Sequence, residues 1–454
     1  MKTPIYDFVT EYIASDGSRL HMPGHKGVSM LGCENRDITE IAGADALYEA
    51  SGIIAESEAN ATALFGTGRT LYSTEGSTQC IKAMLELARC HWQSRQEGMA
   101  ERPVVVAARN VHKAFLYAAI LLDFDVVWLW RTEENPSLCS CEILPETVET
   151  VLAEQGNKVA AVYLTSPNYL GSMADISKIA EICHRHNTLL CVDNAHGAYL
   201  HFLEPSLHPM DLGADLCCDS AHKTLPVLTG GAYLHISKTA PDCLAGCAKS
   251  AMELFGSTSP SYLILQSLDL CNAYLADGYK ETLKQTSTIV ECTKQALLAN
   301  GWQVEPTDPL RITVKAPDGF SGIQMAELLR KNHVECEHAD ENYLVCMVTA
   351  QNKEEDLLRL TGILGQNRYS YEDNKGKKIP VADYLAKKMT MREAYFSCGE
   401  LLPAEKTLHR ICRMPMASCP PAVPVVVPGE IINEDAIRCF CHYGIEKIEV
   451  IKEK

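Results

Sequence analysis

The sequence predicts an α/β fold in which a mostly parallel sheet carries helices on both faces. Between residues 75 and 237, short apolar runs alternate with segments of helical periodicity, as in consecutive βαβ units. The apolar runs contain few polar positions, which indicates strands buried on both faces. The length of 454 residues and the apolar share of 46% are enough for two or three domains. Ligands of such sheets bind beyond the carboxyl ends of the strands.

Each expected element follows from its local pattern. The run PVVVAA is short and apolar, as a buried strand is, and HKAFLYAAILLD after it has helical spacing. The same alternation predicts strands at 103–108, 125–130, 158–165 and 188–195, and helices at 112–123 and 175–187. A largely helical stretch at about 261–300 leads to a second α/β region. In that region we expect strands at 310–316 and 342–349 and a helix at 322–332.

The chain is expected to divide into three parts. Residues 1–30 contain the turn-rich HMPGHKG and form an N-terminal arm. Residues 31–300 form the large ligand-binding domain. Residues 301–454 form the smaller C-terminal α/β region, whose last segment, at about 362–454, includes the proline-rich SCPPAVPVVVPGE.

Composition narrows the classes of function and location. The 41 Lys and Arg against 58 Asp and Glu give a net charge of −17, which argues against nucleic acid or an anionic membrane as a partner. The 20 cysteines include no Cys-x-x-Cys pair, so free thiols in a reducing cytoplasm are expected rather than disulfides or metal sites. We find no secretory signal, and the most apolar stretch, 117–130, is too short for a membrane span. We expect a cytoplasmic protein.

Lys223 and Asp193 are the strongest candidates for chemistry. Lys223 follows the strand-like LCCDSA among hydroxyl and imidazole groups, where partial desolvation favours the amine that a Schiff base requires. Asp193 ends the apolar run LLCVD, where it could keep the pyridine nitrogen of pyridoxal phosphate protonated. At about 3 Å and an effective dielectric of about 20, that attraction is on the order of 5 kcal/mol before desolvation. Taken alone, a surface lysine and a capping aspartate are the simpler interpretations.

A phosphate needs several hydrogen-bond donors, and two segments offer them. Backbone N–H and hydroxyl groups converge where TEGST opens a helical pattern, and further donors lie beside Lys223. The candidates are Gly76, Ser77, Thr78, Ser220 and His222. Ser or Thr before a helix is more often only a cap.

Several histidines are candidates for roles of their own. His112 follows an expected strand, where an imidazole can stack on a flat cofactor ring, and His196 lies three residues beyond Asp193. A lone loop histidine is more often only solvated. His21 and His25 are four residues apart, a metal spacing on a helix, but the proline and glycine between them break any helix. No metal site is expected.

Taken together, these segments resemble the ornithine/lysine/arginine decarboxylase family of pyridoxal-phosphate enzymes. The matching segments run in order over nearly the whole chain: TPIYDFVTEY, LHMPGHKG, DITEIAGADALYEASGIIAESE, TEGST, RNVHKA, TSPNYLGSMADI, VDNAHGAYL, DSAHKTLPVLTGGAYLH, STSPSYLILQSLD and CPPAVPVVVPGE. The resemblance implies a three-layer large domain of the aspartate-aminotransferase-like fold type I, with a smaller C-terminal region. The chain is similar to the shorter members, without an N-terminal receiver-like domain.

The resemblance also implies roles for the candidate residues. Lys223 would form the Schiff base, Asp193 would pair with the pyridine nitrogen, and His112 and Ala195 would lie on the two faces of the ring. The phosphate would be held by Ser77, Thr78, Ser220 and His222. Since the family is at least dimeric with active sites at the interface, a homodimer is expected, in which the neighbour's phosphate is approached by Ser257, Thr258 and Ser259.

We therefore expect pyridoxal-phosphate-dependent decarboxylation of lysine, arginine or ornithine, as in polyamine biosynthesis. There are two alternatives. The chain could catalyse another fold-type-I reaction, such as transamination, racemisation or elimination, or it could be a non-catalytic relative that binds the cofactor. Candidate carboxylates for the substrate's far cation are Glu430, Glu56 and Glu58, although a structural or surface role is the simpler interpretation of each.

Departures from the family pattern leave the substrate open. Asn194 and Tyr199 replace the usual glutamate and second histidine of Asp-Glu-Ala-His-Gly-Ala-His, and Glu75 adds a negative charge near the proposed phosphate. Near the C-terminus, Cys419 opens CPPAVP in place of the common Tyr-Pro-Pro-Gly-Ile-Pro.

Overall fold

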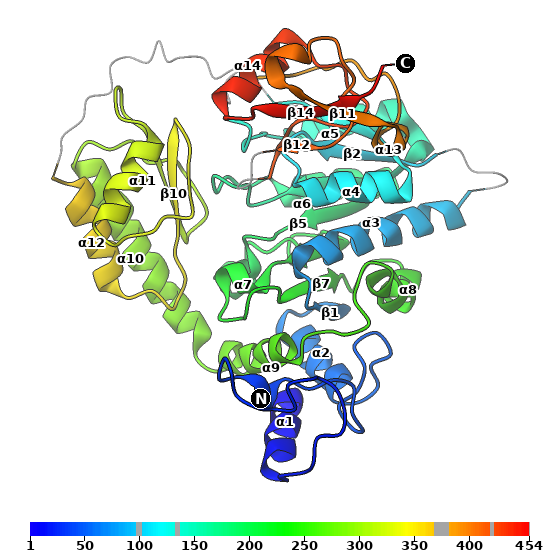
Figure 1. The fold of residues 1–454 in the computed structure, drawn as a ribbon, viewed down its shortest axis with the longest axis vertical. Coiled ribbons are helices and arrows are strands. Elements are labelled where there is room, and N and C mark those ends of the chain that lie inside the picture. Colours follow the sequence, from blue (N-terminus) through cyan, green and yellow to red (C-terminus); the bar gives the residue numbers. More distant parts are fainter. Residues whose placement is uncertain (97–101, 132–136, 367–380, 418–421, 454) are drawn as a thin grey trace. The chain divides into compact units, whose positions relative to one another are not determined.

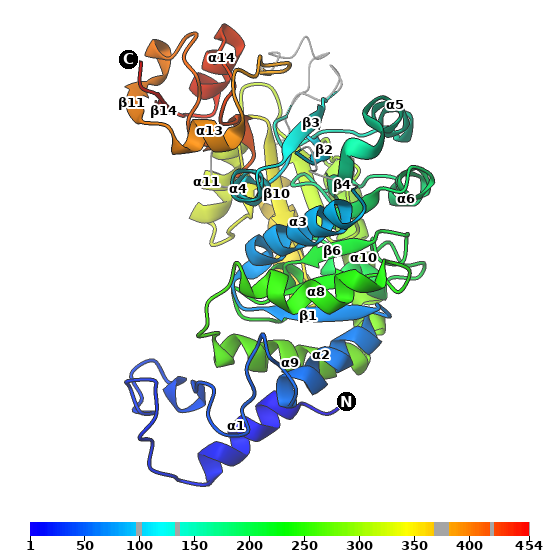
Figure 2. The same ribbon diagram turned by 90° about the vertical axis from the view of Figure 1, so that its right-hand side faces the viewer.

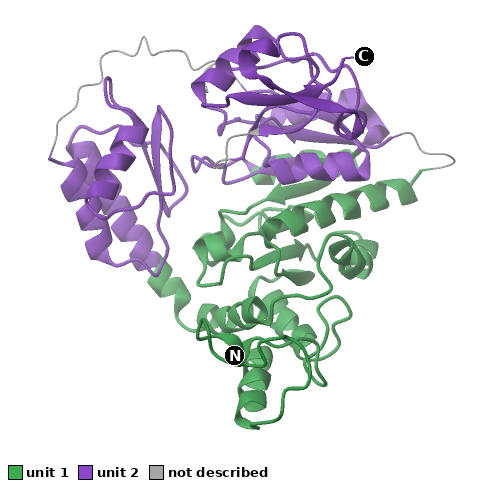
Figure 3. Cartoon of the chain, in the orientation of Figure 1, with its two compact units in different colours: residues 1–100, 160–162, 176–283 green, residues 101–159, 163–175, 284–454 purple. Residues whose placement is uncertain are grey.

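The computed structural model of the chain describes residues 1–96, 102–131, 137–366, 381–417 and 422–453 (Figure 1). The chain forms two compact units (Figure 3). Unit 1 contains residues 1–100, 160–162 and 176–283, and unit 2 contains residues 101–159, 163–175 and 284–454. The expected division into an N-terminal arm, a large domain and a C-terminal region stays a prediction. Cys419 lies outside the described residues.

Unit 1 alternates strands with helices along the chain. Its elements are α1 (Pro4–Ala14), η1 (Glu34–Arg36), α2 (Ile53–Leu64), β1 (Arg69–Ser73), α3 (Gly76–Ser94), α6 (Ile176–Arg185), β5 (Leu189–Asp193), η3 (Ala198–Phe202), β6 (Leu216–Asp219), α7 (Ala221–Thr224), β7 (Ala232–Ile236), α8 (Asp242–Glu253) and α9 (Tyr262–Ala276). Two elements contain residues of both units, β4 (Val159–Thr165) and α10 (Tyr279–Ala299).

Unit 2 holds the remaining elements. They are β2 (Val104–Ala108), α4 (Lys113–Leu122), β3 (Asp125–Leu129), α5 (Pro145–Gln155), η2 (Gly156–Lys158), β8 (Arg311–Lys315), α11 (Gly322–Lys331), β9 (His338–Ala339), β10 (Tyr343–Met347), α12 (Glu354–Leu364), α13 (Met391–Phe396), β11 (Gly399–Pro403), η4 (Ala404–Lys406), β12 (Met416–Ala417), β13 (Pro424–Val426), α14 (Glu434–His442) and β14 (Lys447–Ile451).

The largest sheet has seven strands, in the order β1-β7-β6-β5-β4-β2-β3. The pairs β5–β6 and β2–β3 are parallel, whereas β7 is antiparallel to both β6 and β1. Unit 2 contains the smaller sheet β8-β10-β9 and the strand pairs β11-β14 and β12-β13. The predicted α/β class with a large, mostly parallel sheet is confirmed.

The local patterns place the elements within a few residues of their observed ends. The strands expected at 103–108, 125–130, 158–165 and 188–195 are β2, β3, β4 and β5, and the helices expected at 112–123 and 175–187 are α4 and α6. Helix α4 ends where Asp123 takes the left-handed conformation at φ 55°. All five residues of β2 and of β5 are buried, as their uninterrupted apolar runs predict.

Helices α3 and α8 pack against each other in unit 1 (Figure 2), and both contact strands of the large sheet. Helix α3 turns one side inward, because buried residues recur at helical spacing at Cys80, Ala83, Met84 and Leu87. Among the described residues, none of the helices combines the length and the apolar character needed to cross a bilayer.

The N-terminal helix α1 is held in unit 1 by a buried carboxylate. Asp269 of α9 accepts the backbone N–H groups of Ile5 and Tyr6 at 2.9 and 3.0 Å, and the hydroxyl of Ser57 at 2.5 Å. Ile5 and Tyr6 lie in the first turn of α1, where backbone N–H groups have no partner within the helix. Burial raises the pKa of Asp269 to about 6, although these hydrogen bonds act in the opposite direction.

The pH dependence of stability tests this anchor. Because the pKa of Asp269 is about 6 in the folded chain and 3.8 without its surroundings, its contribution to stability is full below pH 4 and is lost as the pH rises through 6. The quantity to measure is the unfolding free energy of the parent minus that of the Asp269→Asn variant. We expect this difference to fall by on the order of 2 kcal/mol between pH 4.5 and pH 7. Denaturant unfolding at a series of pH values measures it.

A matched control for this prediction lies on the same helix. Asp277 is exposed at the C-terminal end of α9, so Asp277→Asn should change stability by less than about 0.5 kcal/mol at every pH. An Asp269→Asn difference that does not vary with pH would contradict the prediction.

Candidate active site

Lys223 and His196 meet at the edge of the sheet in unit 1. Lys223 lies in α7, directly after β6, and is half-buried, as the sequence predicts. Its Nζ lies 2.9 Å from Nε2 of His196, a buried residue in the turn that follows β5. An amine and an imidazole at this distance can exchange a proton.

Asp193 ends β5 at the same edge of the sheet. The parallel register pairs Asp193 with Cys218 of β6, so both strands end at this edge. The Asp193 side chain is 2% exposed, and its Oδ1 accepts the N–H of Ala195 at 3.2 Å and the S–H of Cys218 at 3.7 Å. The structure therefore places the predicted carboxylate and the predicted amine after neighbouring parallel strands.

Two of the predicted phosphate ligands are also brought together. The Ser220 hydroxyl donates to the Ser77 hydroxyl at 2.8 Å, joining the residue before α7 to the first turn of α3. Thr78 lies in the same turn, at the third position of α3. Gly76 takes φ +70°, and its N–H donates to the carbonyl of Gly230 at 2.7 Å. Gly76 therefore contributes its left-handed backbone to this turn, while its N–H is engaged elsewhere.

His222 is held as a neutral imidazole. Its Nδ1–H donates to the Gly231 carbonyl at 3.0 Å, which leaves Nε2 as an acceptor. Burial lowers the pKa of His222, although the hydrogen bond to Gly231 acts in the opposite direction, and the charge of Lys223 adds a smaller lowering effect. Donation from Nε2 to a phosphate would require a second proton on the ring, so the phosphate role of His222 stays a prediction.

His112 belongs to unit 2. It is the N-cap of α4, where its Nδ1 accepts the backbone N–H of Ala114 at 3.1 Å. Its predicted role of stacking on a cofactor ring stays a prediction.

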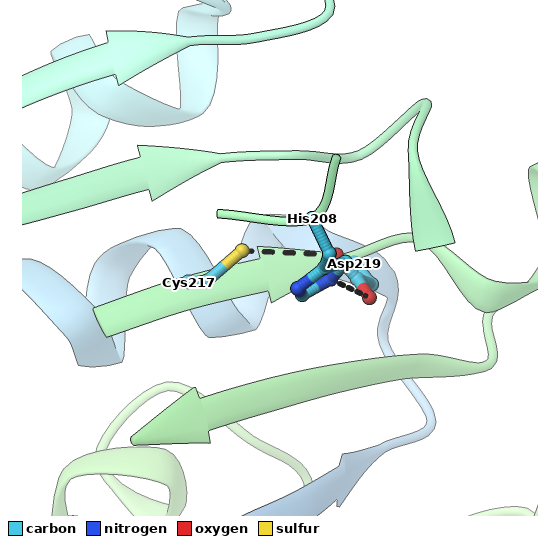
Figure 4. Close-up of side chains that lie close together, drawn as sticks. All are labelled: His208, Cys217 and Asp219. Atoms are coloured by element: carbon cyan, nitrogen blue, oxygen red, sulfur yellow. Dashed lines mark hydrogen bonds and ion pairs between the residues drawn. The ribbon is translucent and has the colours of Figure 1, made fainter. Parts of the chain in front are cut away.

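A buried hydrogen-bond network around Asp219, the last residue of β6, was missed by sequence reasoning. Its Oδ2 accepts Nε2–H of His208 and of His235, both at 3.0 Å, and its Oδ1 accepts the Asn194 amide at 2.7 Å and the Cys217 thiol at 3.8 Å. Figure 4 shows His208 and Cys217 directed at this carboxylate. Burial alone would raise the pKa of Asp219, but His208 and His235 hold it well below the usual range. The run DLCCD repeats the pattern of LLCVD and could have revealed it.

The same cluster has the composition of a metal site. Ligand atoms of His208, Cys217 and Asp219 lie within 4.8 Å of one another. However, Nδ1 of His208 accepts the backbone N–H of Met210 at 3.2 Å, so the ring proton is on Nε2. A nitrogen that carries a proton donates a hydrogen bond and cannot bind a metal. This contact makes His208 a donor to Asp219.

Glu75 organises the loop that follows α8. Its carboxylate accepts the backbone N–H of Ser257 at 2.5 Å, and the Ser257 hydroxyl accepts the N–H of Ser259 at 3.1 Å. The extra negative charge of Glu75 thus has a backbone donor of its own. The approach of residues 257–259 to a neighbour's phosphate stays a prediction.

Two of the three carboxylates considered for the substrate's cation already have cationic partners. Glu430 pairs with Arg109 at 3.0 Å in unit 2, and Glu58 pairs with Lys249 at 2.7 Å in unit 1. Both carboxylates are buried, whereas Glu56 is exposed on α2. These contacts favour the structural interpretation of Glu430 and Glu58.

The chain has the fold of the fold-type-I enzymes. The chain is similar to the lysine decarboxylase of Francisella novicida, with a TM-score of 0.80 over 99% of this chain and 81% of that chain at 16% identity. It is also similar to the serine palmitoyltransferase of Sphingomonas wittichii, with a TM-score of 0.55 over 80% of this chain and 83% of that chain at 12% identity. The predicted fold type is confirmed.

Sequence comparison then shows the family. The model of the Orn/Lys/Arg decarboxylase major domain matches residues 3–318, so the chain belongs to the Orn/Lys/Arg decarboxylase family. An arginine decarboxylase of Bacillus anthracis is 28% identical to it over 96% of this chain and 92% of its own length. The predicted resemblance is confirmed, and the family and its relatives support an amino acid decarboxylase.

Replacing Glu430 separates a structural role from a substrate-binding role. Glu430→Gln would leave Arg109 buried without its counter-ion, so we expect the unfolding free energy to fall by about 3–5 kcal/mol. Denaturant unfolding measures this. Glu449→Gln is the control, because the Glu449–Arg413 pair is partly exposed and should contribute about 1 kcal/mol or less. Unchanged stability with a raised KM would instead place Glu430 at the substrate.

Proposed function

We propose that the protein uses pyridoxal 5'-phosphate to decarboxylate a basic amino acid, releasing carbon dioxide and the corresponding amine. The observation that carries this proposal is the half-buried Lys223, whose Nζ lies 2.9 Å from His196 at the edge where β5 ends in Asp193. Arginine is the first substrate to test, because relatives at 26–28% identity are named arginine decarboxylases. Lysine and ornithine follow from the family's description.

The residues at this edge fit the chemical groups of the cofactor. An amine is available for its aldehyde carbon at Lys223, and a buried carboxylate for its ring nitrogen at Asp193. The hydroxyls of Ser77 and Ser220, 2.8 Å apart, offer donors for its phosphate. When bound, pyridoxal phosphate supplies an electron sink for the electron pair left at the substrate's Cα.

The chain's own residues hold protons and exclude water. Asp193 would keep a proton on the ring nitrogen, and its burial strengthens that attraction because little water screens it. Nζ of Lys223 and the imidazole of His196 are in contact, so either can deliver a proton to Cα and take one back from the other. The buried turn of residues 193–197 restricts solvent on this side of the site.

A homodimer or larger homo-oligomer is part of the proposal. Large apolar side chains of the N-terminal segment are exposed: Leu20 by 94%, Met22 by 63%, Val28 by 66%, Met30 by 86% and Leu31 by 88%. Neighbouring exposed apolar side chains of this size are typical of an association surface. The mass of the protein in solution, compared with 50.0 kDa for one chain, tests this part.

We also propose a reducing cytoplasm as its location, because all the cysteines that the structure describes are free thiols.

Product analysis tests the reaction. Protein loaded with pyridoxal phosphate should release carbon dioxide from arginine, lysine or ornithine and form agmatine or a diamine in equal amount. Formation of a keto acid, or of the opposite enantiomer, would replace decarboxylation by another reaction on the same cofactor. A coloured protein that turns over none of these amino acids would make the chain a non-catalytic relative.

Replacing Lys223 tests the proposed attachment site. Lys223→Ala should abolish carbon dioxide release and the visible absorbance of the covalently held cofactor, because no amine remains at this position. Borohydride treatment of the parent followed by peptide mapping should place the cofactor on the peptide that contains residue 223. Lys238→Ala, an exposed lysine beyond β7, is the control and should keep both signals. Labelling of a different lysine would contradict the assignment.

A further inference from the structure

The side chains of Asn194 and Asp219 join the ends of β5 and β6. The backbone N–H of Asn194 donates to the carbonyl of Cys218 at 2.9 Å, which continues the pairing of the two strands. One residue further, the Asn194 amide donates to Asp219 Oδ1 at 2.7 Å. Both residues are 0% exposed, so this contact is formed without competing water.

The charge on Asp219 decides what residue 194 can be. Each oxygen of Asp219 accepts two hydrogen bonds, and its imidazole partners His208 and His235 both donate from Nε2. A carboxylate with this many donors stays ionised. A carboxylate at position 194 would set a second anion against it or would have to take up a proton. Asn194 supplies the donor that Asp219 requires.

This pair also connects the two halves of the proposed site. Asp219 precedes the turn that carries Lys223, in which the Lys223 N–H donates to the Ser220 carbonyl at 3.0 Å. Asn194 lies between Asp193 and His196, and its carbonyl accepts the N–H of Gly197 at 2.8 Å. A Cβ at Gly197 would clash with Oδ1 of Asn194, so the turn leaves no room for a side chain there.

We propose that Asp219, acting through Asn194, is a positioning residue that orients the Asp193–His196 turn relative to Lys223. The proposal rests on the proposed function, because orientation matters only if Asp193 and Lys223 act on one cofactor. It assigns a role to a carboxylate that touches neither the cofactor nor the substrate. It also makes positions 194 and 219 a unit, in which a donor on one side chain must face an acceptor on the other.

A double-mutant cycle tests the pair. Asn194→Asp sets two carboxylates against each other, and we expect it to weaken binding of pyridoxal phosphate at least about tenfold and to lower kcat, with KM for the amino acid little changed. Asp219→Asn should be less harmful, because the Asn194 amide can turn its oxygen toward the new donor. The double variant restores one carboxylate and one amide and should recover most of the lost affinity.

The readouts separate positioning from stability. Cofactor affinity is measured by absorbance titration, kcat and KM by carbon dioxide release, and thermal unfolding on protein without cofactor. Cys217→Ala, which removes only the weak thiol donor to Asp219, is the control and should change unfolding but leave cofactor affinity within about twofold.

Three outcomes are distinguishable. Recovery of affinity and kcat in the double variant supports the proposal. If the single variants lower only the unfolding temperature, as is expected of Cys217→Ala, the proposal is overturned. It is also overturned if the double variant is no better than Asn194→Asp. If the parent itself neither binds pyridoxal phosphate nor releases carbon dioxide, the proposed function fails. The inference then fails with it, whatever the unfolding temperatures of the single and double variants are.

Discussion

The ionised carboxylate of Asp219, buried at the end of β6, is the interaction on which the candidate site depends. A buried carboxylate is costly unless its oxygens accept hydrogen bonds, and here four donors meet that need. The donors come from four different parts of unit 1: the turn after β5, the loop before β6, strand β6 and strand β7. Satisfying one charge therefore fixes the relative positions of the segments that carry Asp193 and Lys223.

Other buried ionisable side chains of the chain also join separate segments. Glu58 holds Lys249 and the N–H of Tyr72, and Asp269 holds the first turn of α1. In unit 2, Arg109 pairs with Glu430 and stacks on the rings of Trp128 and Trp130, with centroids at 4.9 and 5.5 Å. Each of these carboxylates has its partners within its own unit, so a carboxylate in a family motif need not be directed at a substrate.

The departures from the family pattern acquire physical partners in the structure. Asn194 is matched to Asp219, and Glu75 accepts a backbone N–H from the loop after α8. Ala422 takes φ +59°, and its carbonyl accepts the N–H of Lys113 at 3.0 Å, next to the candidate His112. These three positions therefore have structural partners within the chain.

The sequence by itself determined the α/β class, the main strands and helices, and the family, because buried strands and amphipathic helices leave periodic patterns and because the matching segments are many and ordered. It also predicted the positions of the candidates Lys223 and Asp193 at the carboxyl ends of strands, since each lies at or just after the end of an apolar run. Only the tertiary structure decided which side chains meet. The contacts of Lys223 with His196 and of Asp219 with Asn194, His208 and His235 join residues 11 to 27 positions apart. Such contacts depend on how strands pair and loops return, and no local pattern records that.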